Sequence, residues 1–278
     1  MSYVAPPEVT EDMLEQGTSK SELSSWQQIL RSMIAVFVLS AATVMAILAA
    51  EETGNSLVGA LVFPLGLAVV VVLGLELLTG NFALVPLAVL DGRARLSSLF
   101  RSFGVVLAGH VIGGLLCALL FAAWLTEFWT GGPGLLIDGL IETAEDKTLA
   151  YQELGMPAGI GLALLSAILC NWLVVLGVVM GMTSTSTTGK LAALWLPIAA
   201  FFYLGLEHAV VNLFVIPAGM MVGADVGVDD WLLWNQVPVL IGNLIGGFLL
   251  LGLPVYLAFR TTQEDLPADT AQEPSEGL

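Results

Sequence analysis

Six long apolar segments constrain this chain more than any other feature. A helix needs about 20 mainly apolar residues to cross the hydrocarbon core of a bilayer. Six stretches are long enough, at about 28–50, 57–90, 97–125, 157–182, 191–222 and 232–259. Only 12% of the 278 residues are charged, whereas a soluble globular domain averages about 25%. The chain is therefore predicted to be an all-α integral membrane protein with six transmembrane helices.

The basic residues predict how these spans are oriented, because Lys and Arg accumulate on the cytoplasmic side of membrane proteins. With the N-terminus placed in the cytoplasm, Lys147 is the one basic residue outside. The remaining seven fall inside: Lys20, Arg31, Arg93, Arg95, Arg101, Lys190 and Arg260. We therefore expect a multi-pass protein of the cell (plasma) membrane with both termini in the cytoplasm.

The chain divides into a transport domain and two polar ends. Residues 1–26 lack the basic start and apolar core of a signal peptide, so they are expected to be retained as a cytoplasmic segment. Residues 27–260 form the six-span domain, with repeat halves at about 27–125 and 157–260. Residues 261–278 are an acidic tail, predicted to be disordered. The first 25 residues are predicted to be disordered or to lie on the surface.

An internal repeat relates the two halves. Residues 74–86 read GLELLTGNFALVP and residues 205–217 read GLEHAVVNLFVIP, so both fit the pattern G-L-E-x4-N-x4-P. The pattern pairs Glu76 with Glu207, Asn81 with Asn212 and Pro86 with Pro217. A second match pairs the segment beginning Gly109-His110 with the segment beginning Gly242-Asn243. Three spans in each half predict an inverted 3+3 repeat, which is a transport architecture.

Polar and helix-breaking residues interrupt the second and fifth spans, at Glu76–Pro86 and Glu207–Pro217. Lipid cannot satisfy the exposed backbone groups of a broken helix, so each break must face protein or a water-filled path. The half-helices are expected to begin near Gly80 and Phe214, with positive N-termini that attract a small anion. The alternative reading is that the breaks are packing kinks.

Four polar residues near the breaks are predicted to be structural braces. Glu76 and Glu207 precede the breaks, where a carboxylate can accept hydrogen bonds from freed backbone N–H groups. Asn81 and Asn243 are assigned the same role. A proton relay between the two glutamates is the alternative that we weigh against bracing.

His208 is the leading candidate for function, because it is the only histidine in a broken span and an ionisable group at membrane depth is costly. The alternative is a neutral histidine bonded to a backbone carbonyl. His110 aligns with Asn243 in the repeat, so a structural hydrogen-bonding role is predicted there. The two cysteines, Cys117 and Cys170, lie in apolar stretches without metal-ligand spacing, and we expect no metal and no cofactor.

The chain resembles the formate/nitrite transporter family over residues 27–260. The resemblance rests on Leu78-Thr79-Gly80-Asn81 in the break at 77–81, Cys170-Asn171, Glu207-His208-x3-Asn212, Ile216-Pro217 and Gly242-Asn243-x2-Gly-Gly. It implies an aquaporin-like protomer in a homopentamer, each protomer with its own pore through the lipid bilayer. It also implies a channel or transporter for small monovalent anions, formate first, that pass as the neutral acid near His208. Nitrite, hydrosulfide, acetate and lactate are alternatives within the family.

The resemblance further assigns the pore residues. His208, Thr79, Asn171, Asn212 and Lys147 match the polar substrate pore, with Lys147 tuning the histidine from the outer side. The residues of this chain that match the apolar constrictions of the family are Phe63, Leu67, Leu78, Val174 and Phe201. A solvated loop lysine is the alternative for Lys147. Aliphatic and aromatic residues at helical spacing are usually core, so the constriction set depends on the family alone.

Other functional classes are less well supported. The sequence contains no Gly-x-Ser-x-Gly or His-Glu-x-x-His motif, so we expect no enzyme. The formal net charge of −16 excludes a nucleic-acid partner. A membrane sensor or structural protein without flux, and a channel for neutral solutes, remain as rival readings.

The acidic residues follow the predicted topology. Of the 24 acids, 11 fall in external loops with one lysine, 11 in cytoplasmic loops and tails with seven bases, and two at the breaks. An acidic exterior repels an anionic substrate unless salt screens it, and the Debye length falls to about 3 Å at molar ionic strength. The distribution therefore predicts a salt-loving, halophilic host.

Overall fold

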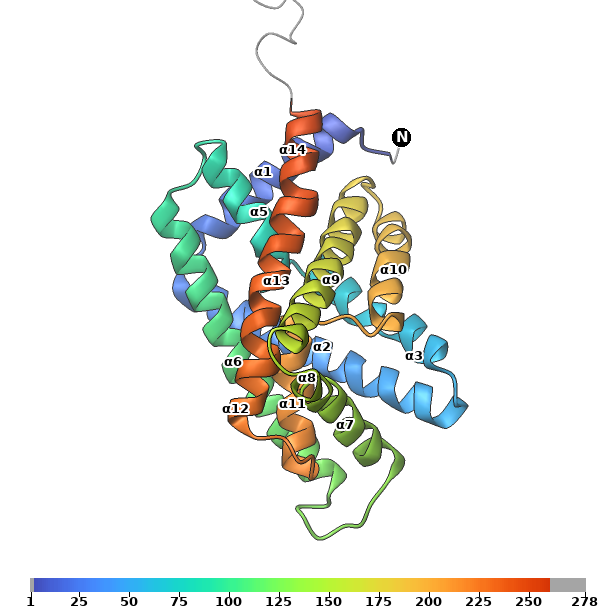
Figure 1. Ribbon diagram of the computed structural model, residues 1–278. Coiled ribbons are helices and arrows are strands. Elements are labelled where there is room, and N and C mark those ends of the chain that lie inside the picture. Colours follow the sequence, from blue (N-terminus) through green and yellow to red (C-terminus); the bar gives the residue numbers. More distant parts are fainter. Residues whose placement is uncertain (1–2, 261–278) are drawn as a thin grey trace, which may run out of the picture.

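The computed structural model describes residues 3–260, and this part of the chain is helical apart from turns and one isolated bridge between Tyr3 and Ser184 (Figure 1). The first half contains α1 (Pro6–Glu22), α2 (Ser25–Thr53), α3 (Ser56–Val62), α4 (Pro64–Val72), α5 (Leu78–Leu90) and α6 (Leu96–Leu125). After it come α7 (Leu135–Asp146), α8 (Leu149–Leu154), α9 (Ala158–Met182), α10 (Thr187–Tyr203) and α11 (Ala209–Val222). The last run is α12 (Val228–Asp230), the π-helical turn η1 (Trp231–Gln236), α13 (Val237–Gly247), the π-helical turn η2 (Phe248–Gly252) and α14 (Leu253–Phe259).

The prediction of an all-α protein is confirmed for residues 3–260. Within them, four helical runs are long and apolar enough to cross a membrane: α2, α6, α9 and the continuous run Val228–Phe259. The second and fifth predicted spans are each divided, into α3 and α4 followed by α5, and into α10 followed by α11. All six predicted apolar segments therefore fall on these helices.

The breaks are shorter and begin earlier than the sequence predicted. They comprise residues 73–77 and 204–208, so α5 begins at Leu78 rather than Gly80, and α11 at Ala209 rather than Phe214. Gly74 and Gly205 follow the ends of the preceding helices with φ of 61° and 66°, a conformation that glycine adopts without steric cost.

The two prolines used to bound the breaks lie elsewhere. Pro86 lies inside α5 and Pro217 inside α11, so the prediction that the interruptions extend to these prolines is wrong. Each α-helical start follows an extended residue, Leu77 or His208. The first backbone N–H of each new helix is bound by a side chain from another helix, which is why the helices begin where they do.

Two alternatives were predicted for residues 1–25, disorder or a position on the surface, and disorder is wrong for Pro6–Glu22, which forms a helix. Val9, Met13 and Leu14 make a buried stripe that packs with Leu84 and other residues of α5. A Cβ on Gly17 would lie 2.2 Å from the carbonyl oxygen of Leu84, so the two helices approach closely. Figure 1 shows α1 beside α5 at one end of the molecule. The predicted disordered tail, 261–278, lies outside the described residues.

The main hydrophobic core lies where α2, α4, α5, α6, α10 and α11 meet, around the two breaks. A second cluster joins α1 to α5, α9 and α14. Cys117 and Cys170 are free and buried. Packing from several helices thus surrounds the interrupted segments, as the backbone groups of a broken membrane helix require.

Candidate functional site

The structure brings the two breaks together at buried polar residues. Thr79, in the first turn of α5, lies with its Oγ1 3.0 Å from Nε2 of His208, the residue that precedes α11. Both side chains are buried. Residues 129 positions apart therefore meet, and both belong to the predicted substrate pore.

The hydrogen bonds of His208 define its tautomer. The backbone N–H of Val211 donates to Nδ1 over 3.2 Å, so His208 caps the N-terminus of α11. In a neutral imidazole one ring nitrogen accepts and the other carries the hydrogen. The hydrogen of neutral His208 is then on Nε2 and points to Thr79 Oγ1, which leaves the Thr79 hydroxyl hydrogen free for another acceptor. The His208 ring also stacks on Phe201, with centroids 5.7 Å apart.

His110 and Asn243 occupy matching positions at the two breaks. The backbone N–H of Leu78 donates to Nε2 of His110 over 3.1 Å, and that of Ala209 donates to Oδ1 of Asn243 over 2.9 Å. Each bond satisfies the first N–H of the helix that follows a break. The repeat mates His110 and Asn243 therefore use different side chains for the same local task.

The two glutamates bind side chains and not the backbone N–H groups that the sequence analysis assigned to them. Glu76 accepts from Nζ of Lys20 over 2.9 Å and from Nδ2 of Asn81 over 2.7 Å. The backbone donors are instead taken by His110 and Asn243, so the carboxylates are available to buried cations and amides. Glu76 thus ties α1 to the first break.

Glu207 has a larger set of donors. It accepts from Lys147 Nζ at 3.2 Å, Tyr151 Oη at 3.0 Å, Asn212 Nδ2 at 2.7 Å and Asn235 Nδ2 at 3.0 Å. Four segments of the chain therefore converge on one carboxylate. The reading of Lys147 as a solvated loop lysine is wrong, because its ammonium group is held at the second break.

Sequence reasoning missed three of these partners. Lys20, Tyr151 and Asn235 were not candidates for any site role. For Lys20 a signal was available, since it lies 56 residues before Glu76 and Lys147 lies 60 residues before Glu207. The polar composition of residues 1–25 concealed it. Nothing in the sequence singles out Tyr151 or Asn235, because both reach Glu207 only through the packing of α8 and η1.

Asn171, on α9, links the first turn of α5 to α13. Its Nδ2 donates to the backbone oxygen of Thr79 over 3.0 Å and to that of Asn243 over 2.6 Å. Its Oδ1 is buried, with no hydrogen-bond partner among the described residues.

The five predicted constriction residues are all buried in one hydrophobic cluster: Phe63, Leu67, Leu78, Val174 and Phe201. The Phe63 and Phe201 rings meet edge to face with centroids 5.5 Å apart. Phe202, which the sequence analysis did not select, stacks on Phe63 at 4.3 Å. Aromatic side chains are thus packed beside His208.

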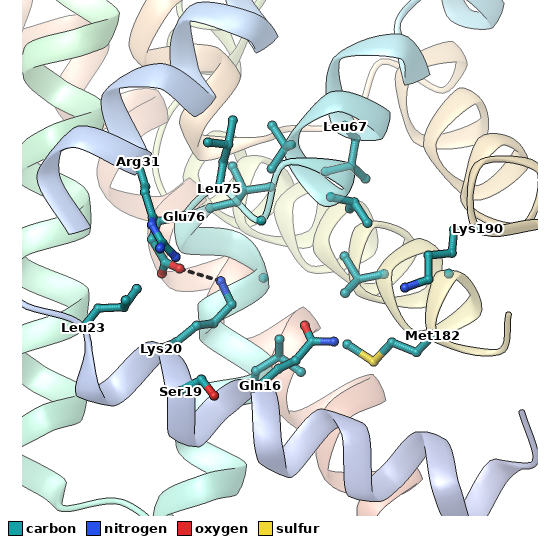
Figure 2. Close-up of a pocket in the computed structure, with 18 residues that line it drawn as sticks. Gln16, Ser19, Lys20, Leu23, Arg31, Leu67, Leu75, Glu76, Met182 and Lys190 are labelled. Carbon is teal, nitrogen blue, oxygen red and sulfur yellow. Dashed lines mark hydrogen bonds and ion pairs between the residues drawn. The ribbon is translucent and has the colours of Figure 1, made fainter. Parts of the chain in front are cut away.

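Two pockets lie on either side of this cluster. One, of about 340 Å³, is lined by residues of α1, the start of α2, Leu67, Glu76 and the start of α10 (Figure 2). The other, of about 210 Å³, is lined by the end of α2, the end of α10, Lys147, Phe201 and His208. Since α2 and α10 run from one pocket to the other, we call these the α1-side pocket and the Lys147-side pocket. Within residues 3–260 no group of His, Cys, Asp and Glu side chains is placed to hold a metal ion.

Comparisons with known proteins agree on one family. The model of the family described as formate/nitrite transporter matches residues 7–257. The uncharacterized transporter YrhG of Bacillus subtilis is 33% identical, over 94% of this chain and 95% of its own. A probable formate transporter of Methanothermobacter thermautotrophicus is 35% identical, over 67% of this chain and 69% of its own. A solved pentameric formate channel with formate bound superposes with a TM-score of 0.69 at 26% identity, over 84% of this chain and 97% of that one.

Proposed function

The chain belongs to the formate/nitrite transporter family, and from this premise we propose that it conducts small monovalent anions, formate first, across a membrane. The resemblance found in the sequence is thereby confirmed, and so is the expectation of a transport protein rather than an enzyme. Formate is placed first because relatives are named as formate channels and transporters. Nitrite, hydrosulfide and acetate are the alternatives that a substrate panel distinguishes.

One observation carries the proposal: Thr79 contacts His208, which lines the Lys147-side pocket and stacks on Phe201 of the apolar cluster. An anion that enters this cluster loses its water, which costs several kcal/mol or more for a bare charge. The Thr79 hydroxyl is free to donate one hydrogen bond to it. Protonation beside His208 converts the anion to the neutral acid, which crosses the apolar residues without this cost.

The test is formate uptake into proteoliposomes across a range of pH. His208→Phe removes both ring nitrogens and is expected to reduce proton-coupled uptake to that of empty liposomes. His208→Asn is the matched control for loss of the helix cap, because asparagine is a good N-cap and preserves the start of α11. Unchanged uptake by a correctly assembled His208→Phe protein would refute the role of the histidine. A panel of formate, nitrite, acetate and hydrosulfide ranks the substrates.

We also propose the inverted six-span repeat as the membrane topology. Support comes from contacts that occur in pairs: Lys20–Glu76–Asn81 and Lys147–Glu207–Asn212, and the caps His110 and Asn243. The sequence repeat aligns the glutamates, the asparagines Asn81 and Asn212, and the two caps, and the lysines precede their glutamates by 56 and 60 residues. In this topology both termini are cytoplasmic and the membrane is the plasma membrane. Accessibility of tags at the two termini in intact cells tests it.

The proposed assembly is a homopentamer. A solved structure similar to this chain is a pentameric formate channel. This chain exposes large apolar residues on several helices, including Leu119, Leu120, Leu165 and Leu196. Such exposed apolar surface suits lipid or a neighbouring protomer. The mass of the detergent-solubilised protein, measured by light scattering, tests the number of protomers.

The acidic exterior supports a further proposal, that the protein works in high salt. Eleven acidic residues fall in the predicted external loops, and their repulsion of an anion is screened at molar ionic strength. Uptake is expected to increase as salt is added outside the vesicles. An optimum at low ionic strength would contradict this proposal and leave the transport activity itself untouched.

A further inference from the structure

The α1-side pocket collects basic side chains from three helices. Lys20 of α1, Arg31 of α2 and Lys190 of α10 line it, and Glu76 is the one acidic residue among the described lining residues. Figure 2 shows Arg31 extending toward Lys20 and Glu76 from one wall, and Lys190 entering from the opposite wall. The cavity measures about 340 Å³, which is far more than one formate ion occupies.

Two of these positive charges are not neutralised. Glu76 is already bound by Lys20 and by Asn81. Within residues 3–260, neither Arg31 nor Lys190 forms an ion pair. Both side chains are half-buried, so water screens them less than it screens a fully exposed charge. The pocket therefore presents two uncompensated cations in a chain whose formal net charge is −16.

The α1-side pocket has an excess of positive charge, and the Lys147-side pocket does not. The Lys147-side pocket, of about 210 Å³, is lined by one basic residue, Lys147, and one acidic residue, Glu51. Its lining charges cancel. A need to attract a monovalent anion applies equally to both ends of a path, so it does not account for two further cations at one end.

We propose that the α1-side pocket is a binding site for small dianions, of the class of short dicarboxylates, and that a bound dianion blocks the conduction path. This inference rests on the proposed function. Two carboxylates supply one negative charge for each of Arg31 and Lys190, and Gln16 and Ser19 add polar groups to the same lining. The cost of desolvating an ion increases with the square of its charge, so the apolar cluster around Leu67 stops a dianion more strictly than a monoanion.

Succinate is the probe for this site. Formate uptake is measured in proteoliposomes whose orientation is established with an N-terminal tag, and sodium chloride matches the ionic strength. Succinate added on the α1 side is expected to inhibit uptake, whereas succinate on the Lys147 side is not. Equal inhibition from both sides, or none from the α1 side, overturns the proposal.

Variants that each remove one positive charge test whether succinate inhibits uptake from the α1-side pocket. Arg31→Gln and Lys190→Gln are each expected to raise the half-inhibiting succinate concentration about tenfold, the change that accompanies loss of one ordinary charge-assisted hydrogen bond. Inhibition is expressed relative to the uninhibited uptake of each variant. Arg95→Gln is the matched control, because Arg95 is exposed and does not line the pocket. If the control shifts as much as the two pocket variants, the effect is general electrostatics and the site is refuted.

A binding measurement separates this inference from the proposed function. Calorimetric titration of the full-length protein in detergent with succinate requires no formate transport. Binding that weakens in Arg31→Gln and Lys190→Gln, in a protein that carries no formate, supports the site and refutes the proposed function. Normal formate uptake without succinate binding refutes the site and leaves the proposed function standing.

Discussion

Lys20→Met and Lys147→Met each remove the cation that pairs with a buried glutamate, and the two variants are expected to lose different amounts of folding stability. Glu76 and Glu207 are 1% and 2% exposed, and their partners Lys20 and Lys147 are 18% and 17% exposed, so burial is nearly equal. The surroundings of the carboxylates are not equal. Without Lys20, Glu76 retains one donor, Asn81. Without Lys147, Glu207 retains three donors.

The expected loss in the free energy of unfolding follows from the number of hydrogen-bond donors that each carboxylate retains. Removing one partner of a buried ion pair costs about 3–5 kcal/mol, because the other charge is left uncompensated. We expect that range for Lys20→Met. For Lys147→Met we expect about 1–3 kcal/mol, since three hydrogen bonds to the Glu207 carboxylate remain and each offsets part of the loss. The difference of about 2 kcal/mol corresponds to roughly a thirtyfold difference in the unfolding equilibrium.

Equilibrium unfolding by sodium dodecyl sulfate in mixed micelles, followed by helical circular dichroism, measures these free energies. Lys190→Met is the matched control, because Lys190 forms no ion pair among the described residues, and it is expected to change stability by less than about 0.5 kcal/mol. Adding Glu76→Gln to Lys20→Met removes the stranded charge and should recover most of the loss. Equal costs for the two lysine variants, or no recovery, would refute the reasoning.

Two further predictions concern how α1 and the loop after α5 are held. Burial alone would raise the pKa of Asp91, but hydrogen bonds from Tyr256 and Arg93 outweigh it and keep that pKa below its ordinary value of 3.8. The resulting stability is present above that value and is lost as the pH falls through the lower folded-state pKa. Asp91→Asn should therefore flatten the loss of stability that occurs as the pH falls below 3.8, as measured by acid unfolding. Gly17→Val places a Cβ 2.2 Å from a carbonyl oxygen of α5, and it should lower the folding stability by about 1–3 kcal/mol and accelerate proteolysis of α1. Gly104→Val is the control, because its Cβ meets no atom within 4 Å, and it should leave α1 as protected from proteolysis as in the unchanged protein.

Much of the fold could be predicted from the sequence, because the information is local. A run of apolar residues determines whether a segment suits a membrane or a core, and all six predicted segments are helical, with a break in the second and the fifth. The repeated G-L-E-x4-N-x4-P pattern placed both interruptions within a few residues. His208 was selected because it is the only histidine in a broken span, and Thr79 was selected by the family resemblance; the two side chains meet beside the Lys147-side pocket.

The starts of the half-helices could not be read from their own residues. α5 and α11 begin where His110 and Asn243, from other helices, accept their first backbone N–H groups. Prolines mark local stiffness in a sequence, but a proline inside a helix does not end it when neighbouring helices support the backbone. That support exists only once the helices have packed.

The partners of the buried charges were decided by the tertiary structure alone. Lys20 lies in a polar segment that composition assigns to solvent, and it reaches Glu76 only because the buried stripe of α1 packs on α5. Tyr151 and Asn235 reach Glu207 from segments 56 and 28 residues away. Sequence alone determines that a carboxylate buried in an apolar span needs compensation, because an uncompensated charge there is costly. Which groups supply it depends on the path of the chain, since a hydrogen bond requires atoms about 3 Å apart and not residues near in sequence.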